Sequence, residues 1–198
     1  MMAAPQMSAT QMSATQAAGA PPDAQLTHMG IFVSDLDKMV AFYQRVFGMV
    51  ITDRGSNYRG NAVVFLSRNP AEHHQLVLAQ GRAPGTETTV QQVSFEVREL
   101  EDLRAFHARL VTMNIQDLAP RTHGNAWSIY FHDPEGNRVE IYKPSPWHVS
   151  QPYGEPLDLT EPAQVIHERT LELIRNDPSF CPQEEWAAKL RAQLGAMQ

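Results

Sequence analysis

Hydrophobic and polar positions change their spacing several times along the first part of the chain. Residues 26–33 alternate between the two classes, which is typical of a half-buried β-strand. The polar stretch Ser34–Asp37 then favours the start of a helix, and apolar side chains recur at helical spacing from Met39 to Val46. Further strands are predicted at 49–54, 60–67 and 73–79. The pattern therefore predicts one strand, one helix and three further strands.

The same succession of elements recurs 64 residues further along the chain. At this constant offset Val33 meets Val97 and Pro70 meets Pro134, and no gap is needed. Self-similarity at a fixed spacing indicates a duplicated unit. We therefore expect a second unit with a strand at 91–97, a helix at 99–111 and strands near 115–119, 126–132 and 138–143.

The last predicted strand carries a carboxylate, Glu140. Successive side chains of a strand point to opposite faces, so Arg138, Glu140 and Tyr142 share one face. A carboxylate on the inner face of a sheet is costly unless it is paired. Glu140 is therefore expected to meet either an arginine or a metal ion.

The offset also compares the last strands of the two units. It aligns Leu76 with Glu140 and His74 with Arg138. Because these positions share a face in the second unit, His74 is predicted to face inward. Its neighbour His73 is predicted to face away.

Composition limits the class of protein. The 198 residues are 42% hydrophobic, which suits one domain of ordinary size with extensions. The net charge of −6 disfavours a surface for nucleic acid or for an anionic membrane. No apolar run approaches the ~18 residues of a spanning helix. A single cysteine, Cys181, allows no internal disulfide framework and suits the cytoplasm, where we expect the protein to act.

Both ends of the chain differ from the repeated part. The segment "QMSATQMSATQ" repeats a five-residue unit, and residues 1–24 are predicted to be a disordered tail without a secretory signal. Helices are predicted near 161–175 and 183–194, the second with a stripe of Trp186, Leu190 and Leu194 that should pack on its own domain or on a partner subunit. The expected organisation is a tail at 1–24, a domain at 25–145 with modules at 25–80 and 89–144, and an extension at 146–198.

Two tandem βαβββ units, each with an Asn-Pro or Asp-Pro turn before its last strand, resemble the vicinal oxygen chelate superfamily. That superfamily includes glyoxalase I, fosfomycin-resistance proteins and extradiol ring-cleavage dioxygenases. The resemblance covers about residues 25–145. It implies an α+β fold in which two modules form a half-barrel cup around a divalent metal, here with a helical C-terminal extension. Cups of this kind commonly pair, so a homodimer is expected.

Within the superfamily, the segment "THGNAWSIYFHDPEGNRVEIY" is similar to the fingerprint of the extradiol dioxygenases. The matching residues are His123, Ile129, Tyr130, Asp133, Pro134, Gly136 and Glu140. Arg121 departs from the pattern, which usually has a small or uncharged residue there.

The resemblance also assigns roles to individual positions. His28, Gln92 and Glu140 take the places of the metal ligands, although Gln92 stands where a histidine is expected. The remaining assignments are catalytic: His74 as a base or proton shuttle, and His123 and Tyr130 as hydrogen-bond partners of the substrate.

The leading hypothesis is an Fe(II)-dependent extradiol-type dioxygenase that cleaves a catechol-like aromatic diol with O₂. Two histidines and a carboxylate leave open positions on Fe(II), whereas the amide of Gln92 is a weaker ligand than imidazole. Two alternatives follow from this departure. The site could hold Mn²⁺, Ni²⁺ or Zn²⁺ and run an isomerase or lyase reaction of the glyoxalase type, or the cup could bind a small aromatic ligand without being an enzyme.

Overall fold

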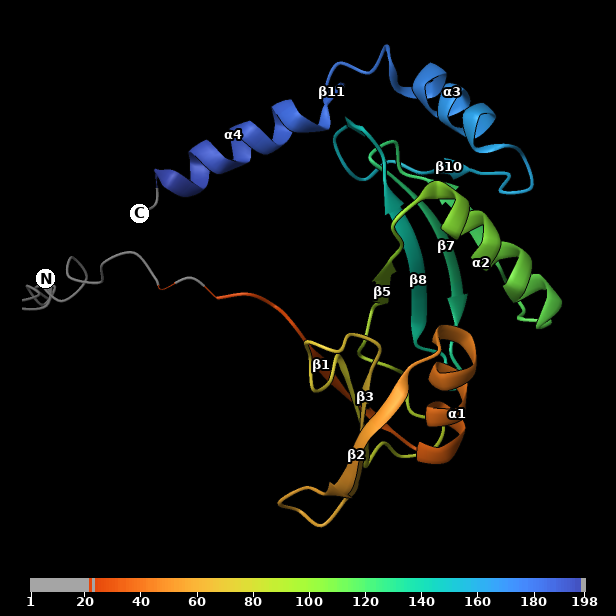
Figure 1. Cartoon of the computed structure of the whole chain (residues 1–198), viewed down its shortest axis with the longest axis vertical. Helices are drawn as coiled ribbons and strands as arrows, with labels where there is room; N and C mark the ends of the chain where they lie inside the picture. Colours follow the sequence, from red (N-terminus) through yellow and green to blue (C-terminus); the bar gives the residue numbers. More distant parts are fainter. Residues whose placement is uncertain (1–21, 23, 197–198) are drawn as a thin grey trace, which may run out of the picture.

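The chain forms two modules of the same design, followed by a C-terminal extension (Figure 1). The computed structural model describes residue 22 and residues 24–196, so the predicted tail lies almost entirely outside the described residues. The first module contains β1 (Met29–Val33), α1 (Leu36–Phe47), β2 (Val50–Ser56), β3 (Ala62–Ser67) and β4 (Leu76–Gln80). The second contains β5 (Val93–Glu96), α2 (Leu100–Thr112), β6 (Ala119–Thr122), β7 (Ala126–His132) and β8 (Arg138–Pro144). The predicted βαβββ order is confirmed in both modules.

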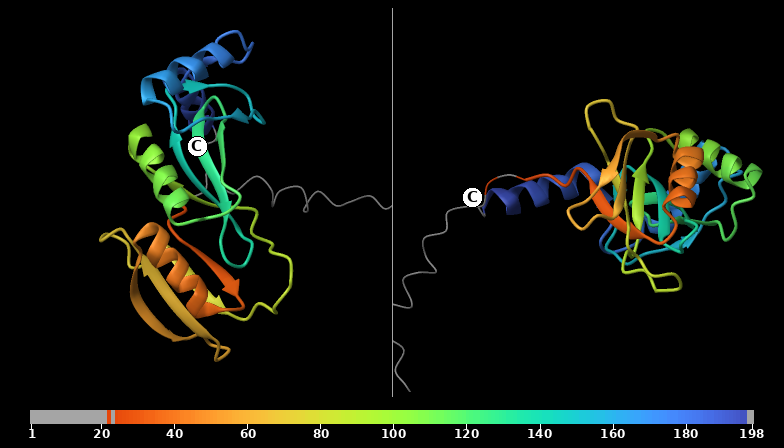
Figure 2. Two further views of the ribbon diagram at one scale, coloured as in Figure 1. Left: turned by 90° about the vertical axis from the view of Figure 1, so that its right-hand side faces the viewer. Right: turned by 90° about the horizontal axis from the view of Figure 1, so that it is seen from below.

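The two sheets share one topology. The first has the strand order β1-β4-β3-β2, and the second has the order β5-β8-β7-β6 with β10 (Glu155–Pro156) added beside β6. In each module the first and last strands are parallel neighbours. The sheets are not hydrogen-bonded to each other within the described residues, and Figure 2 shows one module beyond the other rather than a single closed barrel.

Each sheet has a face covered by its helix and a face left open. In β1, Ile31 and Val33 are buried against α1, whereas Phe32 between them is 59% exposed. In β8, Val139 and Ile141 are fully buried, and Glu140 lies on the opposite face. The alternation read from the sequence therefore reports the helix-covered side correctly, and the predicted functional residues lie on or beside the open faces.

The constant offset of the repeat fails in the last strand of each module. Met29 pairs with Leu76, and its repeat partner Val93 pairs with Val139. Leu76 therefore corresponds to Val139 and faces the core, and it is Val77 that corresponds to Glu140. The prediction that Leu76 matches Glu140 is wrong because the constant offset conceals two differences in length. The chain from β1 to β3 is one residue shorter than the chain from β5 to β7, whereas the turn between Leu66 and Leu76 is two residues longer than the turn between Phe131 and Val139, which leaves a net shift of one residue.

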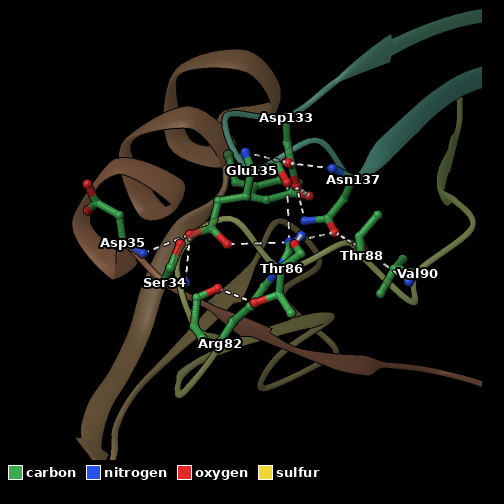
Figure 3. Close-up of polar contacts among 11 residues, drawn as sticks. Ser34, Asp35, Arg82, Thr86, Thr88, Val90, Asp133, Glu135 and Asn137 are labelled. Carbon is green, nitrogen blue, oxygen red and sulfur yellow. Dashed lines mark hydrogen bonds and ion pairs between the residues drawn. The ribbon is translucent and has the colours of Figure 1, made fainter.

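The turn between β7 and β8 holds the two modules together (Figure 3). Its Glu135 side chain accepts hydrogen bonds of 2.7 Å from the backbone N–H groups of Ser34 and Asp35, at the start of α1. Arg82, which follows β4, donates to the carbonyl of Glu135 and lies 3.5 Å from its Oε2. Ring stacking between Phe47 and Phe95 at 3.8 Å adds an apolar contact between the modules.

The C-terminal extension contains the two helices that the sequence predicts. Its elements are β9 (Trp147–His148), β10, α3 (Ala163–Ile174), β11 (Cys181–Pro182) and α4 (Gln183–Gly195). Helix α3 buries Ile166 and Ile174, whereas α4 buries no residue and leads away from the body of the molecule (Figure 1). No helix in the described ranges is both long and apolar enough to cross a membrane.

Candidate functional site

A buried carboxylate lies at the centre of the open face of the second sheet. Glu140 is only 8% exposed and accepts four hydrogen bonds. Its Oε1 accepts from Tyr130 at 2.6 Å and from Ser128 at 2.8 Å. Its Oε2 accepts from Ser94 at 2.6 Å and from the Gln92 amide at 3.0 Å. Because a carboxylate offers about four acceptor positions, this one is fully occupied.

The strand register explains this convergence. Ser94 on β5 and Tyr130 on β7 are both directly opposite Glu140 on β8. Ser128 lies two residues before Tyr130 on β7 and therefore on the same face, and Gln92 immediately precedes β5. The sequence analysis missed the two serines, although strand alternation places both of them beside the predicted residues.

His123 extends the network towards the C-terminal extension. Its Nε2 lies 2.8 Å from the Tyr130 hydroxyl oxygen, and its Nδ1 lies 2.6 Å from the backbone carbonyl oxygen of Tyr153. A carbonyl only accepts, so Nδ1 donates. The Tyr130 hydroxyl therefore lies between the imidazole of His123 and the carboxylate of Glu140.

Tyr130 is held in its protonated form. Burial raises the pKa of Tyr130 to about 12, and the hydrogen bond to Glu140 and the charge of that carboxylate act in the same direction. The guanidinium of Arg138, 3.8 Å from the centre of the Tyr130 ring, opposes the shift. The hydroxyl of Tyr130 is therefore a donor over the whole range in which an enzyme works.

This pKa predicts a specific change in pH dependence. Because the folded-state pKa of about 12 exceeds the ordinary value of 10.0, the stability contributed by Tyr130 is complete below pH 10.0 and is lost as the pH rises towards 12. Tyr130→Phe should remove that part of the alkaline loss of stability. Denaturant unfolding between pH 9 and pH 12, with Tyr58→Phe as the exposed control, measures it; equal pH profiles for the two variants would contradict the assignment.

A second cluster lies in the first module. The His28 and His74 rings are 4.4 Å apart between centroids, and His74 also contacts Phe65. Desolvation lowers the pKa of His74, and the neighbouring His28 and His73 lower it further. His73 does not face away from His74 as predicted, because their Nδ1 atoms are 2.9 Å apart. Both residues precede β4, so strand alternation does not apply to them.

The predicted site residues are thus brought together in two groups. Gln92, His123, Tyr130 and Glu140 form one group, and His28 and His74 form the other. Among the described residues, no hydrogen bond, ion pair or ring contact joins the groups, and no three His, Cys, Asp or Glu side chains gather as a metal site. The imidazole nitrogens, the amide oxygen and the carboxylate of these groups are donors that suit a divalent cation.

Comparison with known proteins agrees with this architecture. Residues 25–141 match the family model of the Glyoxalase/Bleomycin resistance protein/Dioxygenase superfamily. The chain is 29% identical over 123 residues to Biphenyl-2,3-diol 1,2-dioxygenase 3 of Rhodococcus globerulus, covering 59% of this chain and 62% of that relative. It is 26% identical over 119 residues to the metallothiol transferase FosB of Lysinibacillus sphaericus, covering 59% of this chain and 80% of the relative.

A solved structure shows the same fold. A glyoxylase/bleomycin resistance protein/dioxygenase domain from Frankia sp. EAN1pec superposes with a TM-score of 0.52 at 19% identity, covering 62% of this chain and 98% of that domain. The fosfomycin resistance protein FosX from Listeria monocytogenes, complexed with Mn(II) and sulfate, gives a TM-score of 0.49 at 18% identity, covering 62% of this chain and 94% of FosX.

Two βαβββ modules with polar open faces define a vicinal oxygen chelate protein. The chain belongs to the Glyoxalase/Bleomycin resistance protein/Dioxygenase superfamily, because the family model matches more than half of its length. The match spans about 62% of the length of the dioxygenase relative, so the two proteins are similar over part of their lengths.

Proposed function

We propose that the chain is a metal-dependent dioxygenase of the extradiol type that cleaves a catechol-like aromatic diol with O₂. The observation that carries the proposal is the hydrogen-bonded series His123–Tyr130–Glu140, which assembles three residues of the extradiol fingerprint on one open sheet face. The similarity to a biphenyl-diol dioxygenase supports the same substrate class. Fe(II) is the cofactor that this reaction type favours.

His28, Gln92 and Glu140 are the residues that would hold the metal, which supplies Lewis acidity towards the two substrate oxygens. Glu140 carries the negative charge, and the Gln92 amide is already 3.0 Å from it. An amide that turns over presents oxygen instead of nitrogen, which changes Gln92 from a donor to Glu140 into a neutral ligand. Once a metal occupied Glu140, the Tyr130 hydroxyl would exchange its bond to that carboxylate for one to substrate oxygen, and His123 would support it from behind.

We further propose that a homodimer completes the site. His28 lies beside the first sheet and Glu140 on the second, and these sheets are separate within one chain. Their open faces are free to meet across a two-fold axis, where the same contact is made twice. His28 of the partner subunit would then join Gln92 and Glu140.

Subunit mixing tests the shared site. His28→Ala and Glu140→Gln chains should each be inactive, and refolding them together should restore up to about a quarter of wild-type activity, since half of the dimers then contain one intact site. Mixing either variant with itself is the control. A mixture that stays inactive, although mixed dimers form, would show that each chain builds its own site.

Metal content and O₂ uptake test the activity. Protein purified without oxygen should contain iron and consume O₂ with catechol and with biphenyl-2,3-diol. Iron-free protein loaded with Mn²⁺, Ni²⁺ or Zn²⁺ serves as the control. Activity with these metals and without O₂ uptake would contradict the dioxygenase proposal and support an isomerase or lyase.

One observation favours a second candidate, a cup that binds a small aromatic ligand without a metal. All four acceptor positions of Glu140 are filled by protein donors, so the carboxylate needs no cation to be satisfied. The same purified protein decides between the candidates. Failure to bind any divalent metal, together with saturable binding of catechols, would favour the non-enzymatic protein.

Gln92→His should strengthen iron binding. Imidazole is a better ligand for Fe(II) than an amide, and the variant restores the usual pair of histidines with one carboxylate. The affinity of the metal-free protein for Fe(II), titrated without oxygen, should rise by roughly tenfold or more. Gln91→His, the neighbouring exposed position, is the matched control. An affinity that is unchanged or weaker in Gln92→His would show that Gln92 only hydrogen-bonds to Glu140.

A further inference from the structure

A hydrogen-bonded series of side chains leads from the surface of the first module to His74. Asp53 on β2 contacts His73, with 2.8 Å between Oδ2 and Nε2. His73 in turn contacts His74, with 2.9 Å between the two Nδ1 atoms. Both ring nitrogens of His73 and Nδ1 of His74 therefore have partners. Nε2 of His74 has no hydrogen-bond partner among the described residues.

Strand pairing brings Asp53 and Phe65 close to the imidazoles of His73 and His74. Strand β2 changes register between Ile51 and Asp53, which puts Asp53 directly opposite Phe65 on β3. Residues that are directly opposite share a face, so Asp53 and Phe65 lie on the same side of the sheet. The Phe65 ring packs against both imidazoles, with centroid distances of 5.7 Å to His73 and 5.1 Å to His74.

With His73 neutral, the chemistry of the partners determines where the protons lie. A carboxylate only accepts hydrogen bonds, so Nε2 of His73 carries a proton. In a neutral imidazole the other nitrogen is then an acceptor, which makes Nδ1 of His73 the acceptor for His74. Nδ1 of His74 must therefore carry its proton, and its Nε2 has a free lone pair.

We propose that Asp53 and His73 are positioning residues that hold His74 in the tautomer with a protonated Nδ1 and a free Nε2. The use of that lone pair rests on the proposed function. Nε2 would accept a hydrogen bond from a substrate hydroxyl. The tautomer itself is a property of the protein without metal or substrate.

Nuclear magnetic resonance tests the tautomer directly. The full chain is labelled with ¹⁵N, prepared free of metal and measured at about pH 8, where unperturbed histidines are neutral. The His74 signals, assigned by their loss in His74→Gln, should show a protonated Nδ1 and an unprotonated Nε2. A protonated Nε2 in the wild-type protein overturns the proposal.

Variants separate positioning from general structure. His73→Ala should give a mixture of His74 tautomers, whereas His73→Asn should keep the wild-type tautomer because its amide oxygen can replace Nδ1 as acceptor. Asp53→Asn should also weaken the preference, since an amide can donate as well as accept. Asp37→Asn, an exposed acid of the same module, is the control and should change nothing. A retained tautomer in both His73→Ala and Asp53→Asn contradicts the series.

Kinetics adds a second readout. Asp53→Asn and His73→Ala should lower kcat roughly 10- to 100-fold with little change in KM, as loss of an orienting partner does. In a His74→Gln background, Asp53→Asn should have no further effect on kcat. A further loss there would mean that Asp53 acts on stability and not through His74. Absence of any O₂ uptake with diols in the wild-type protein would refute the proposed function, while the tautomer measurement would still stand.

Discussion

Replacing Glu140 with alanine is expected to abolish activity and also to destabilise the second module. Four hydrogen bonds end on this buried carboxylate, and without it the donors of Ser128 and Tyr130 lose their acceptor inside the protein. Hydrogen bonds to charged groups contribute about 1.5–3 kcal/mol each, but water can reach the sites of Ser94 and Gln92, so we expect a net loss of about 2–4 kcal/mol. Turnover should fall by at least roughly 100-fold.

Urea unfolding and turnover measurements check both parts. Glu96→Ala is the matched control, because Glu96 lies two residues after Ser94 on β5 and is exposed. It should change the free energy of unfolding by less than about 0.5 kcal/mol. Glu140→Gln keeps the size of the side chain and should recover part of the stability without recovering activity. If Glu140→Ala were as stable as Glu96→Ala, the network would not support the fold.

Replacing Arg82 with alanine is expected to loosen the connection between the modules. The Glu135 side chain is 7% exposed, and its Oε2 has no hydrogen-bond donor among the described residues. The Arg82 guanidinium, 3.5 Å away and 14% exposed, is the charge that compensates it (Figure 3). Breaking a buried pair by removing one partner costs about 3–5 kcal/mol, because the remaining charge stays buried.

A double-mutant cycle checks this prediction. Glu135→Gln removes the charge but keeps an oxygen that can accept from the N–H groups of Ser34 and Asp35. Adding it to Arg82→Ala should therefore cost less than the sum of the two single changes. Arg54→Ala, which breaks an exposed pair with Asp37 at 3.9 Å, is the control and should cost less than about 0.5 kcal/mol. Strict additivity would show that the pair does not act as one unit.

Several features of the fold could be predicted from the sequence because they depend on neighbouring residues alone. The alternation in 26–33 and the helical spacing after Ser34 are local patterns, and both elements are present as β1 and α1. Asp35 caps α1 by accepting from the N–H of Lys38, and Gly48 ends it with a φ of 66°. The repeat then gave the second module the same order of elements.

The repeat was a less reliable guide to side-chain orientation. A one-residue change of register moves a strand residue to the opposite face, and Leu76 corresponds to Val139, one residue short of the constant offset. The same turn removes His73 and His74 from the strand, so their rings meet instead of facing apart. A comparison at one constant offset, without gaps, cannot detect differences in the length of the segments inside each module.

The sequence by itself determined the two-module fold, the face on which Glu140 lies and the His123–Tyr130–Glu140 order, because these follow from local periodicity and from a contiguous motif. Only the tertiary structure decided which donors surround Glu140 and that Asp53 reaches His73. It also decided that His28 and Glu140 lie beside different sheets. These contacts join residues that are distant in the chain. Strand pairing, turn length and the packing of one module on the other determine them, and a local sequence pattern contains no information about these three features.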